Sequence, residues 1–349
     1  MSDILALARP EILALKPYSH ASWDPSLERL HANELPWRAE TDRSRAGLNR
    51  YPEPHPHELA ALLAKLYGVA PDQLLPGRGS DESIDLVVRG FCRAGVDNVI
   101  ICPPTFGMYA VAARIQGAEV REVPLLPERG FALDVDAVLA ACDARTRIVF
   151  LCTPNNPTGN AIDPASITRI LGALAGKALV VVDEAYIEFS GDASLTTSLS
   201  KYSNLVVLRT LSKAYGLAGA RVGSLIASPA IVALLAKVIP PYSMPQLTIE
   251  AVFATLSSPQ LAIQRERVAQ VRAERDRVAV ALAASPAVVR VWPSVANFLL
   301  TDFRDPDDAL QAARRARLII RDMRNVSPQS LRISGGSAEQ NNRLIRSFA

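Results

Sequence analysis

The chain has 349 residues, of which 38 are Lys or Arg and 35 are Asp or Glu, so its formal net charge is only +3. Its 49% hydrophobic and 21% charged residues are ordinary for a globular chain of about two domains. The small charge argues against nucleic acid and membrane surfaces as partners, and no apolar run reaches the roughly 18 residues of a membrane span.

The N-terminal segment carries one short helical pattern at residues 4–15 and then a polar arm. We expect residues 1–45 to form this arm and part of a smaller domain. No basic region precedes the first apolar stretch, so we expect no signal peptide. Prolines between residues 51 and 57 exclude regular structure there, and a helix is predicted at 59–67, ended by Gly68.

Strand and helix patterns alternate from about residue 77 onward. Helices are predicted at 83–91, 109–116 and 164–174, and strands at 98–102, 119–124, 147–152, 178–182 and 205–208. Alternation of this kind predicts an α/β domain with a mostly parallel sheet between helices. The strand segments are almost wholly apolar, which is typical of strands buried on both faces. We assign residues 46–240 to this large domain.

The pattern changes after residue 240, where Pro240, Pro241 and Pro245 mark a boundary. One long helix is predicted at 251–284, followed by shorter strands near 289–292, 297–301 and 330–334. This mixture predicts a smaller α+β domain at 241–349. The four cysteines are well separated and form no Cys-x-x-Cys pair, which favours reduced thiols in the cytoplasm.

Three polar groups follow directly on predicted strands: Asn156, Asp183 and Lys213. Because parallel strands present their carboxyl ends at one crevice, we expect these side chains to meet there. A carboxylate forced into the core by residues 178–182 needs a cationic or hydrogen-bonding partner, and an unprotonated lysine amine can attack an aldehyde. Such a set can hold and use pyridoxal phosphate, although each residue alone is more often structural.

An anion site is predicted where glycines precede the helix after residue 79, because bare N–H groups and the helix dipole favour a phosphate. The carboxylates of Asp81 and Glu82 would repel that phosphate, so we expect only their backbone to take part. The complete predicted set is Ser80, Asp81, Glu82, Ser212 and Arg221.

Two tyrosines are candidates for contacts with a heterocycle. Tyr109 follows a strand and a turn, where it could stack on the ring or equally serve as a core aromatic. Tyr186 lies three residues after Asp183 and, like Asn156, could donate to a ring oxygen. The Asn156–Pro157 bond is a candidate cis peptide. His55 and His57 have no third ligand in view, so no metal site is predicted.

The ordered motifs are Gly79-Ser80-Asp81-Glu82, Asn155-Asn156-Pro157-Thr158-Gly159, Asp183-Glu184-Ala185-Tyr186, Ser212-Lys213-Ala214 and Gly219-Ala220-Arg221-Val222-Gly223. Over nearly the whole chain they resemble fold-type I aminotransferases that depend on pyridoxal 5'-phosphate. The resemblance is closer to the histidinol-phosphate aminotransferases, including Asn33-Glu34 and Leu331-Arg332-Ile333. It implies a homodimer and a cytoplasmic enzyme of histidine biosynthesis.

The resemblance implies a role for each matching residue. Lys213 would bind the cofactor covalently, Asp183 would pair with its ring nitrogen, and Tyr109 would stack on the ring. Asn156 and Tyr186 would contact the ring oxygen, while the predicted anion site would bind the phosphate. Tyr51 would reach the cofactor phosphate of the neighbouring subunit. The substrate side would comprise Tyr18, Asn33, Arg321 and Arg332.

The implied reaction interconverts L-histidinol phosphate and 2-oxoglutarate with imidazole acetol phosphate and L-glutamate, in a ping-pong cycle. Three alternatives on the same fold are an aromatic amino-acid aminotransferase, a phosphothreonine decarboxylase and a non-catalytic binding domain. Lys213 argues against the last of these. A nicotinamide-dependent dehydrogenase is disfavoured because no Gly-x-Gly-x-x-Gly follows an early strand.

Overall fold

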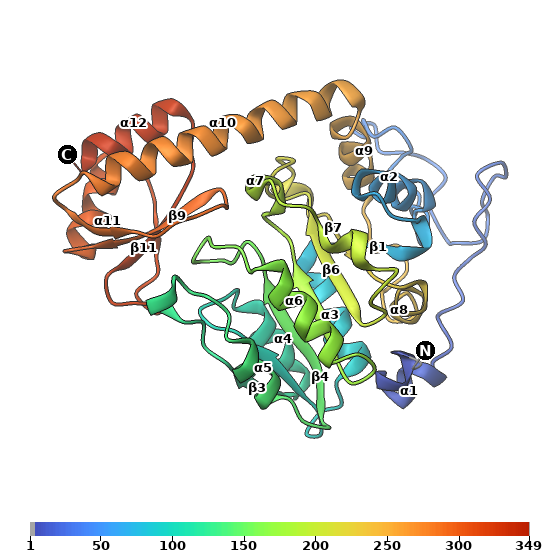
Figure 1. Cartoon of the computed structure of the whole chain (residues 1–349). Helices are drawn as coiled ribbons and strands as arrows, with labels where there is room; N and C mark the ends of the chain where they lie inside the picture. The colour runs from blue at the N-terminus through green and yellow to red at the C-terminus, as the bar shows by residue number, and fades with distance from the viewer. Residues whose placement is uncertain (1–3, 349) are drawn as a thin grey trace.

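A computed structural model describes residues 4–348, in which a long helix joins a large α/β domain to a smaller one (Figure 1). The large domain contains a seven-stranded sheet of order β1-β7-β6-β5-β4-β2-β3. Its strands are β1 (Leu74–Gly77), β2 (Asn98–Ile101), β3 (Glu119–Glu122), β4 (Thr146–Cys152), β5 (Leu179–Asp183), β6 (Leu205–Thr210) and β7 (Gly223–Ile226). Its main helices are α2 (His57–Tyr67), α3 (Ser80–Phe91), α4 (Met108–Gln116), α5 (Val135–Ala141), α6 (Pro164–Ala173), α7 (Ile187–Ser190) and α8 (Pro229–Leu235).

The sheet is mostly parallel, as predicted. β3, β2, β4, β5 and β6 pair in parallel, and only β7 runs against its neighbours β6 and β1. The sequence pattern missed β1 and β7, because each spans only four residues and glycine and proline occur among them.

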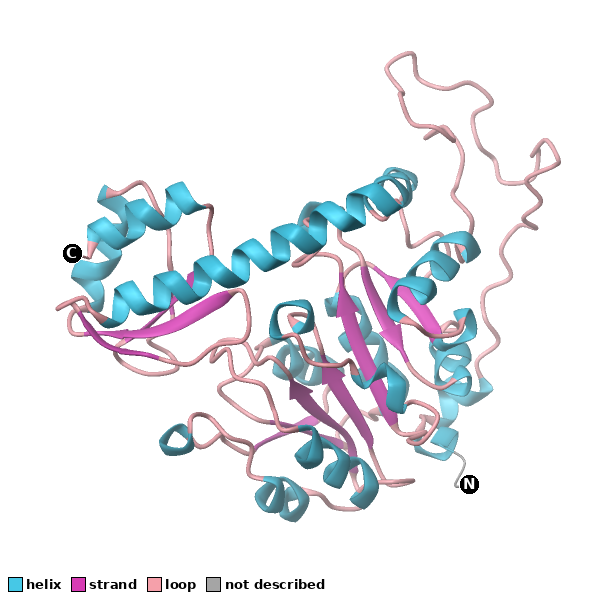
Figure 2. Ribbon diagram, turned by 45° about the horizontal axis from the view of Figure 1, so that its top comes forward, coloured by secondary structure: helices cyan, strands magenta, loops and turns pink. Residues whose placement is uncertain are grey.

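The central strands are buried on both faces. Val180 and Val182 of β5 belong to one hydrophobic core, whereas Leu179 and Val181 belong to another on the opposite face. Helices lie on both sides of these strands (Figure 2). This arrangement explains the continuous apolar runs, since no residue of a sandwiched strand faces water.

The long helix predicted at 251–284 is two helices, α9 (Gln246–Thr255) and α10 (Ser258–Ala283). Ser257 has the extended backbone of an N-cap, and Pro259 lies in the first turn of α10. Proline lacks the N–H that a continuous helix would need, so the chain restarts there. Helix α10 then crosses from the large to the small domain (Figure 1).

The small domain is built on an antiparallel sheet of order β10-β11-β9-β8. Its elements are β8 (Val288–Val291), β9 (Phe298–Phe303), α11 (Pro306–Arg315), β10 (Arg321–Asp322), β11 (Ser330–Ser334) and α12 (Ala338–Ser347). Val278 and Leu282 of α10 pack with Phe303, Leu331 and Leu344 into its core. Within residues 4–348, no helix has both the length and the apolar composition of a bilayer crossing.

Both ends of the large domain differ from the expected boundaries. The segment η1 (Ile4–Leu7) contributes Ile4 to a core of the large domain, and α1 (Pro10–Ala14) follows it, so this part of residues 1–45 does not join the small domain. Met244 and Val252 also belong to a large-domain core, beyond the boundary expected at residue 240. Tertiary packing decides which domain these segments join, and the prolines and pattern changes used to set the expected boundaries carry no information about it.

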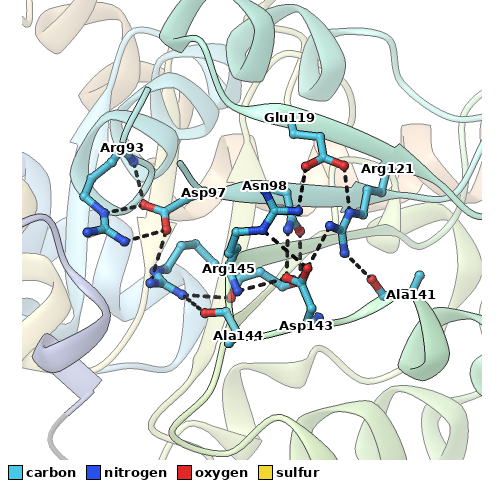
Figure 3. Close-up of polar contacts among 11 residues, drawn as sticks. Arg93, Asp97, Asn98, Glu119, Arg121, Ala141, Asp143, Ala144 and Arg145 are labelled. Carbon is cyan, nitrogen blue, oxygen red and sulfur yellow. Dashed lines mark hydrogen bonds and ion pairs between the residues drawn. The ribbon is translucent and has the colours of Figure 1, made fainter. Parts of the chain in front are cut away.

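A polar network closes the amino ends of β2 and β4 (Figure 3). Asp97, almost fully buried, accepts hydrogen bonds from Arg93 and forms an ion pair with Arg147 at 3.1 Å. Burial alone would raise the pKa of Asp97, but these partners outweigh it and the pKa is lowered. The network lies at the sheet edge opposite the strand carboxyl ends, so it serves the fold rather than the site.

Candidate functional site

A cavity of about 510 Å³ opens at the carboxyl ends of β4, β5 and β6, between the two domains. Residues that the sequence analysis selected line much of it. They are Ser80, Asp81, Asn156, Asp183, Tyr186, Ser212, Lys213, Arg221, Arg321 and Arg332. The shared sheet edge explains how residues more than a hundred positions apart meet in one place.

Asp183, the last residue of β5, is 3% exposed. The Tyr109 hydroxyl donates to its Oδ2 at 2.8 Å, and the Ala185 N–H donates to its Oδ1 at 3.0 Å. Burial nevertheless raises the pKa of Asp183 to about 6, because these two donors do not replace the lost water. A buried carboxylate of this kind favours a cationic ligand.

Lys213 lies in the loop after β6, and its amine projects into the cavity. Its Nζ is 5.6 Å from the ring centroid of Tyr186. Partial burial and then the nearby charge of Arg332 lower the pKa of Lys213. A lowered pKa increases the fraction of unprotonated amine, which is the form that reacts with a carbonyl.

A cradle that suits an anion lies at the start of α3. Gly79, the N-cap residue, has φ +86°, and a Cβ there would lie 2.5 Å from Nη2 of Arg221. A Cβ on Gly223 would lie 2.4 Å from the backbone nitrogen of Ser80. The two glycines therefore allow bare helix N–H groups and a guanidinium to converge, which suits a phosphate.

The two acidic residues of this turn behave differently. The side chain of Glu82 turns back to the N–H of Arg78 at 2.6 Å and does not line the cavity. The carboxylate of Asp81 faces the cavity and accepts a hydrogen bond from Arg221 Nη2 at 3.1 Å. We expected only the backbone of Asp81 to take part in the anion site, and its side chain also faces that site.

The prediction that Tyr109 stacks on a bound ring is also corrected. Tyr109 is fully buried, and its ring stacks on Phe150 with centroids 4.8 Å apart. Phe106, three residues earlier, lines the cavity instead. The helix α4 begins between them, at Met108, and turns Tyr109 toward the core. Tyr109 thus holds Asp183 from the core side, while the partly buried Phe106 is the aromatic residue that lines the cavity.

Two arginines of the small domain face the cavity from adjacent strands. Arg321 of β10 and Arg332 of β11 are direct partners in an antiparallel register, so their side chains share one face. Arg332 donates to the amide oxygen of Asn156, while its Nε is buried without a partner. In residues 4–348 neither guanidinium forms an ion pair, since the nearby Asp322 pairs with Arg324.

Three predicted residues from the N-terminal part of the chain do not line this cavity: Tyr18 and Asn33 of the arm, and Tyr51 just beyond it. Tyr18 and Tyr51 are largely exposed. The arm lies on the side of the large domain remote from the small domain (Figure 1). Within one chain, the described residues of the arm, from Ile4 onward, therefore supply no group to this cavity.

Several lining residues are not among the site residues predicted from the sequence: Thr105, Phe106, Cys152, Thr210, Met323 and Asn325. A signal existed for some of them. Phe106 follows β2 in a proline-rich turn, and Thr210 ends β6, so both occupy strand-end positions. Nothing in the pattern around Met323 and Asn325 marked them, because they reach the cavity only through domain packing.

The family model for aminotransferase class I and II matches residues 29–348. Histidinol-phosphate aminotransferase from Xylella fastidiosa is 47% identical, covering 98% of this chain and 95% of that protein. The corresponding protein from Xanthomonas euvesicatoria is 48% identical, covering 99% and 96%. The crystal structure of the Sinorhizobium meliloti histidinol-phosphate aminotransferase in complex with pyridoxal-5'-phosphate is 26% identical, with a TM-score of 0.76, covering 86% and 84%.

Proposed function

The chain belongs to the class I and II aminotransferase family, and we propose that it exchanges amino groups between L-histidinol phosphate and 2-oxoglutarate with pyridoxal phosphate as cofactor. The products would be imidazole acetol phosphate and L-glutamate. The observation that carries the substrate assignment is the Arg321–Arg332 couple, which forms no ion pair within residues 4–348 and shares a cavity with Lys213 and Asp183.

The residues of the cavity fit pyridoxal phosphate at each of its functional groups. Asp183 suits a protonated ring nitrogen, because burial disfavours an unpaired carboxylate there. The amine of Lys213 suits the aldehyde, and the cradle of Ser80 and Arg221 suits the phosphate. When bound, the cofactor supplies an electron sink for the bond that breaks at the substrate Cα.

The remaining chemistry falls to side chains of this chain. Lys213, whose pKa is lowered, would accept the proton from the substrate Cα as general base and, as general acid, deliver it to the former aldehyde carbon of the cofactor. Tyr186 and Asn156, which both line the cavity, would contact the ring oxygen of the bound cofactor. Arg332, proposed to bind the substrate, donates a hydrogen bond to Asn156, proposed to contact the cofactor. This bond fixes the two side chains relative to each other, which helps to orient the substrate against the cofactor.

The paired arginines favour a phosphorylated substrate. Like charges directly opposite each other on adjacent strands are destabilising. Burial lowers the pKa of Arg332, and the positive charge of Arg321 lowers it further. An anionic substrate removes this repulsion. We propose that Arg332 binds 2-oxo-acid or amino-acid carboxylates and that both arginines bind the phosphate of histidinol phosphate.

The substrate proposal is tested by a half-reaction. L-Histidinol phosphate added without a keto acid should convert the bound cofactor to its aminated form, seen as a change in absorbance. Conversion by phenylalanine with the higher kcat/KM would favour the aromatic aminotransferase. Release of CO₂ from phosphothreonine without 2-oxoglutarate would favour the decarboxylase.

Arg321→Ala should lower kcat/KM for histidinol phosphate by about 30- to 100-fold, because one charge-assisted bond to the phosphate is lost. The value for phenylalanine should change little, since that substrate has no phosphate. Arg315→Ala, at an exposed pair with Asp308, is the matched control. Equal losses for both substrates would contradict a phosphate contact by Arg321.

We also propose a homodimer in which Tyr51 contacts the cofactor phosphate of the neighbouring subunit. The Glu34 carboxylate accepts from the Tyr51 N–H at 2.7 Å, and the Tyr51 ring packs on Tyr242 at 4.8 Å. These contacts hold Tyr51 outward, away from the cavity of its own chain. Exposed apolar residues of the arm, among them Leu30 and Trp37, favour burial against a second copy.

Mixing two defective variants tests the contact between subunits. Tyr51→Ala and Lys213→Ala homodimers should each be impaired at limiting cofactor. After exchange of subunits, about a quarter of wild-type sites should be intact, because each mixed dimer joins Lys213 of one chain to Tyr51 of the other. Activity that does not recover although mixed dimers form would reject the contact.

We further propose a cytoplasmic location, which the four unpaired thiols favour.

A further inference from the structure

The proposed phosphate cradle already contains an anion that belongs to the chain. The Asp81 carboxylate accepts from Arg221 Nη2 at 3.1 Å, while Nη1 of the same guanidinium donates to Ser212 Oγ at 3.3 Å. Asp81 and Arg221 are both about half-exposed at the cavity surface. Asp81 thus occupies Nη2, one of the two terminal nitrogens of Arg221 that a phosphate would use.

A phosphate that binds Arg221 in this cradle would lie beside the Asp81 carboxylate, which already contacts Nη2 of that guanidinium. The guanidinium can serve both anions only in part, because Nη1 also donates to the Ala218 carbonyl at 3.2 Å. Two anions sharing one cation repel each other, and the repulsion is stronger where a cavity wall excludes water. The carboxylate must therefore rotate away, or the phosphate must bind less tightly.

The charge of Asp81 also reaches the reactive groups. It opposes the lowering of the pKa of Lys213, and it adds to the raised pKa of Asp183. Release of Asp81 from Arg221 therefore changes the field at both residues. The neighbouring acid Glu82 has no such effect on the cavity, because its carboxylate is taken by Arg78.

We propose that the Asp81 carboxylate is an internal competitor for the cofactor phosphate, which holds Arg221 in the cofactor-free protein and sets how tightly the phosphate end binds. This inference rests on the proposed function. It assigns to the Asp81 side chain a role distinct from that of its backbone N–H at the helix start. This competition would allow the cofactor to exchange, and it would keep Arg221 oriented when no cofactor is bound.

The test compares cofactor-free wild-type protein with Asp81→Asn by titration with pyridoxal phosphate and, separately, with inorganic phosphate at constant ionic strength. Asp81→Asn should bind both about five- to tenfold more tightly, because the competing charge is gone while shape is kept. Dilution of the loaded variant should release cofactor correspondingly more slowly.

Asp85→Asn is the control, since Asp85 lies one turn further along α3, pairs with Arg89 on the surface and carries the same charge. It should leave both affinities unchanged. Unchanged or weaker binding by Asp81→Asn would overturn the proposal, because Asp81 would then only orient Arg221 or stabilise the helix. If wild-type protein binds no pyridoxal phosphate, the proposed function fails, and the inorganic phosphate titration alone decides the role of Asp81.

Discussion

Lys213→Ala is expected to abolish turnover, with a loss of about 10⁴-fold or more, because no other amine in the lining of the cavity can take its place. The variant should still bind the cofactor without a covalent bond, since Asp183, Ser80 and Arg221 remain. Steady-state assays and an absorbance spectrum measure the two effects separately.

Lys201→Ala is the matched control, because Lys201 lies on the surface beside Tyr202 and outside the cavity. It should retain wild-type turnover. Borohydride reduction of the loaded wild-type protein should leave the cofactor attached to the peptide that contains Lys213. Turnover of Lys213→Ala within tenfold of wild type, or attachment at another lysine, would remove the basis of the proposed mechanism.

Asp183→Asn is expected to affect activity and stability in opposite directions. Turnover should fall by about a hundredfold or more, because a neutral amide cannot hold a proton on the ring nitrogen of the cofactor. The cofactor-free protein should gain on the order of 1–2 kcal/mol at pH 8, because a buried unpaired charge is removed. The Tyr109 hydroxyl can accept from the new amide, so its hydrogen bond is retained.

The sign of this effect follows from the pKa of about 6 in the folded protein, above the roughly 4 of an unfolded chain. Folded protein binds the proton more tightly, so cofactor-free wild type gains stability as the pH falls from about 7 toward 4. The advantage of Asp183→Asn should therefore shrink below pH 6 and vanish near pH 4. Urea unfolding at pH 8, 6 and 4 measures it, and a difference independent of pH would contradict the burial of a charged Asp183.

The architecture of the large domain was predictable because its strands are covered on both faces. Burial on both sides imposes a continuous apolar run, and the first polar residue after such a run must lie at the end of a strand. Asp183 is such a residue, whereas Asn156 and Lys213 follow the ends of their strands by a few positions, and all three line one cavity. The short strands β1 and β7 carry no comparable pattern, since four residues can be buried by neighbours alone.

Tertiary structure decided which side of an element each remaining side chain takes. Phe106 and Tyr109 both follow β2, but only the start of α4 decides that one faces the cavity and the other the core. The direct pairing of Arg321 with Arg332 depends on the register of β10 against β11, which joins residues eleven positions apart. Sequence periodicity shows that a run of residues is buried. The side that each of these side chains takes depends instead on the rotation of one helix or on the register of one strand pair, and packing partners distant in the sequence set both.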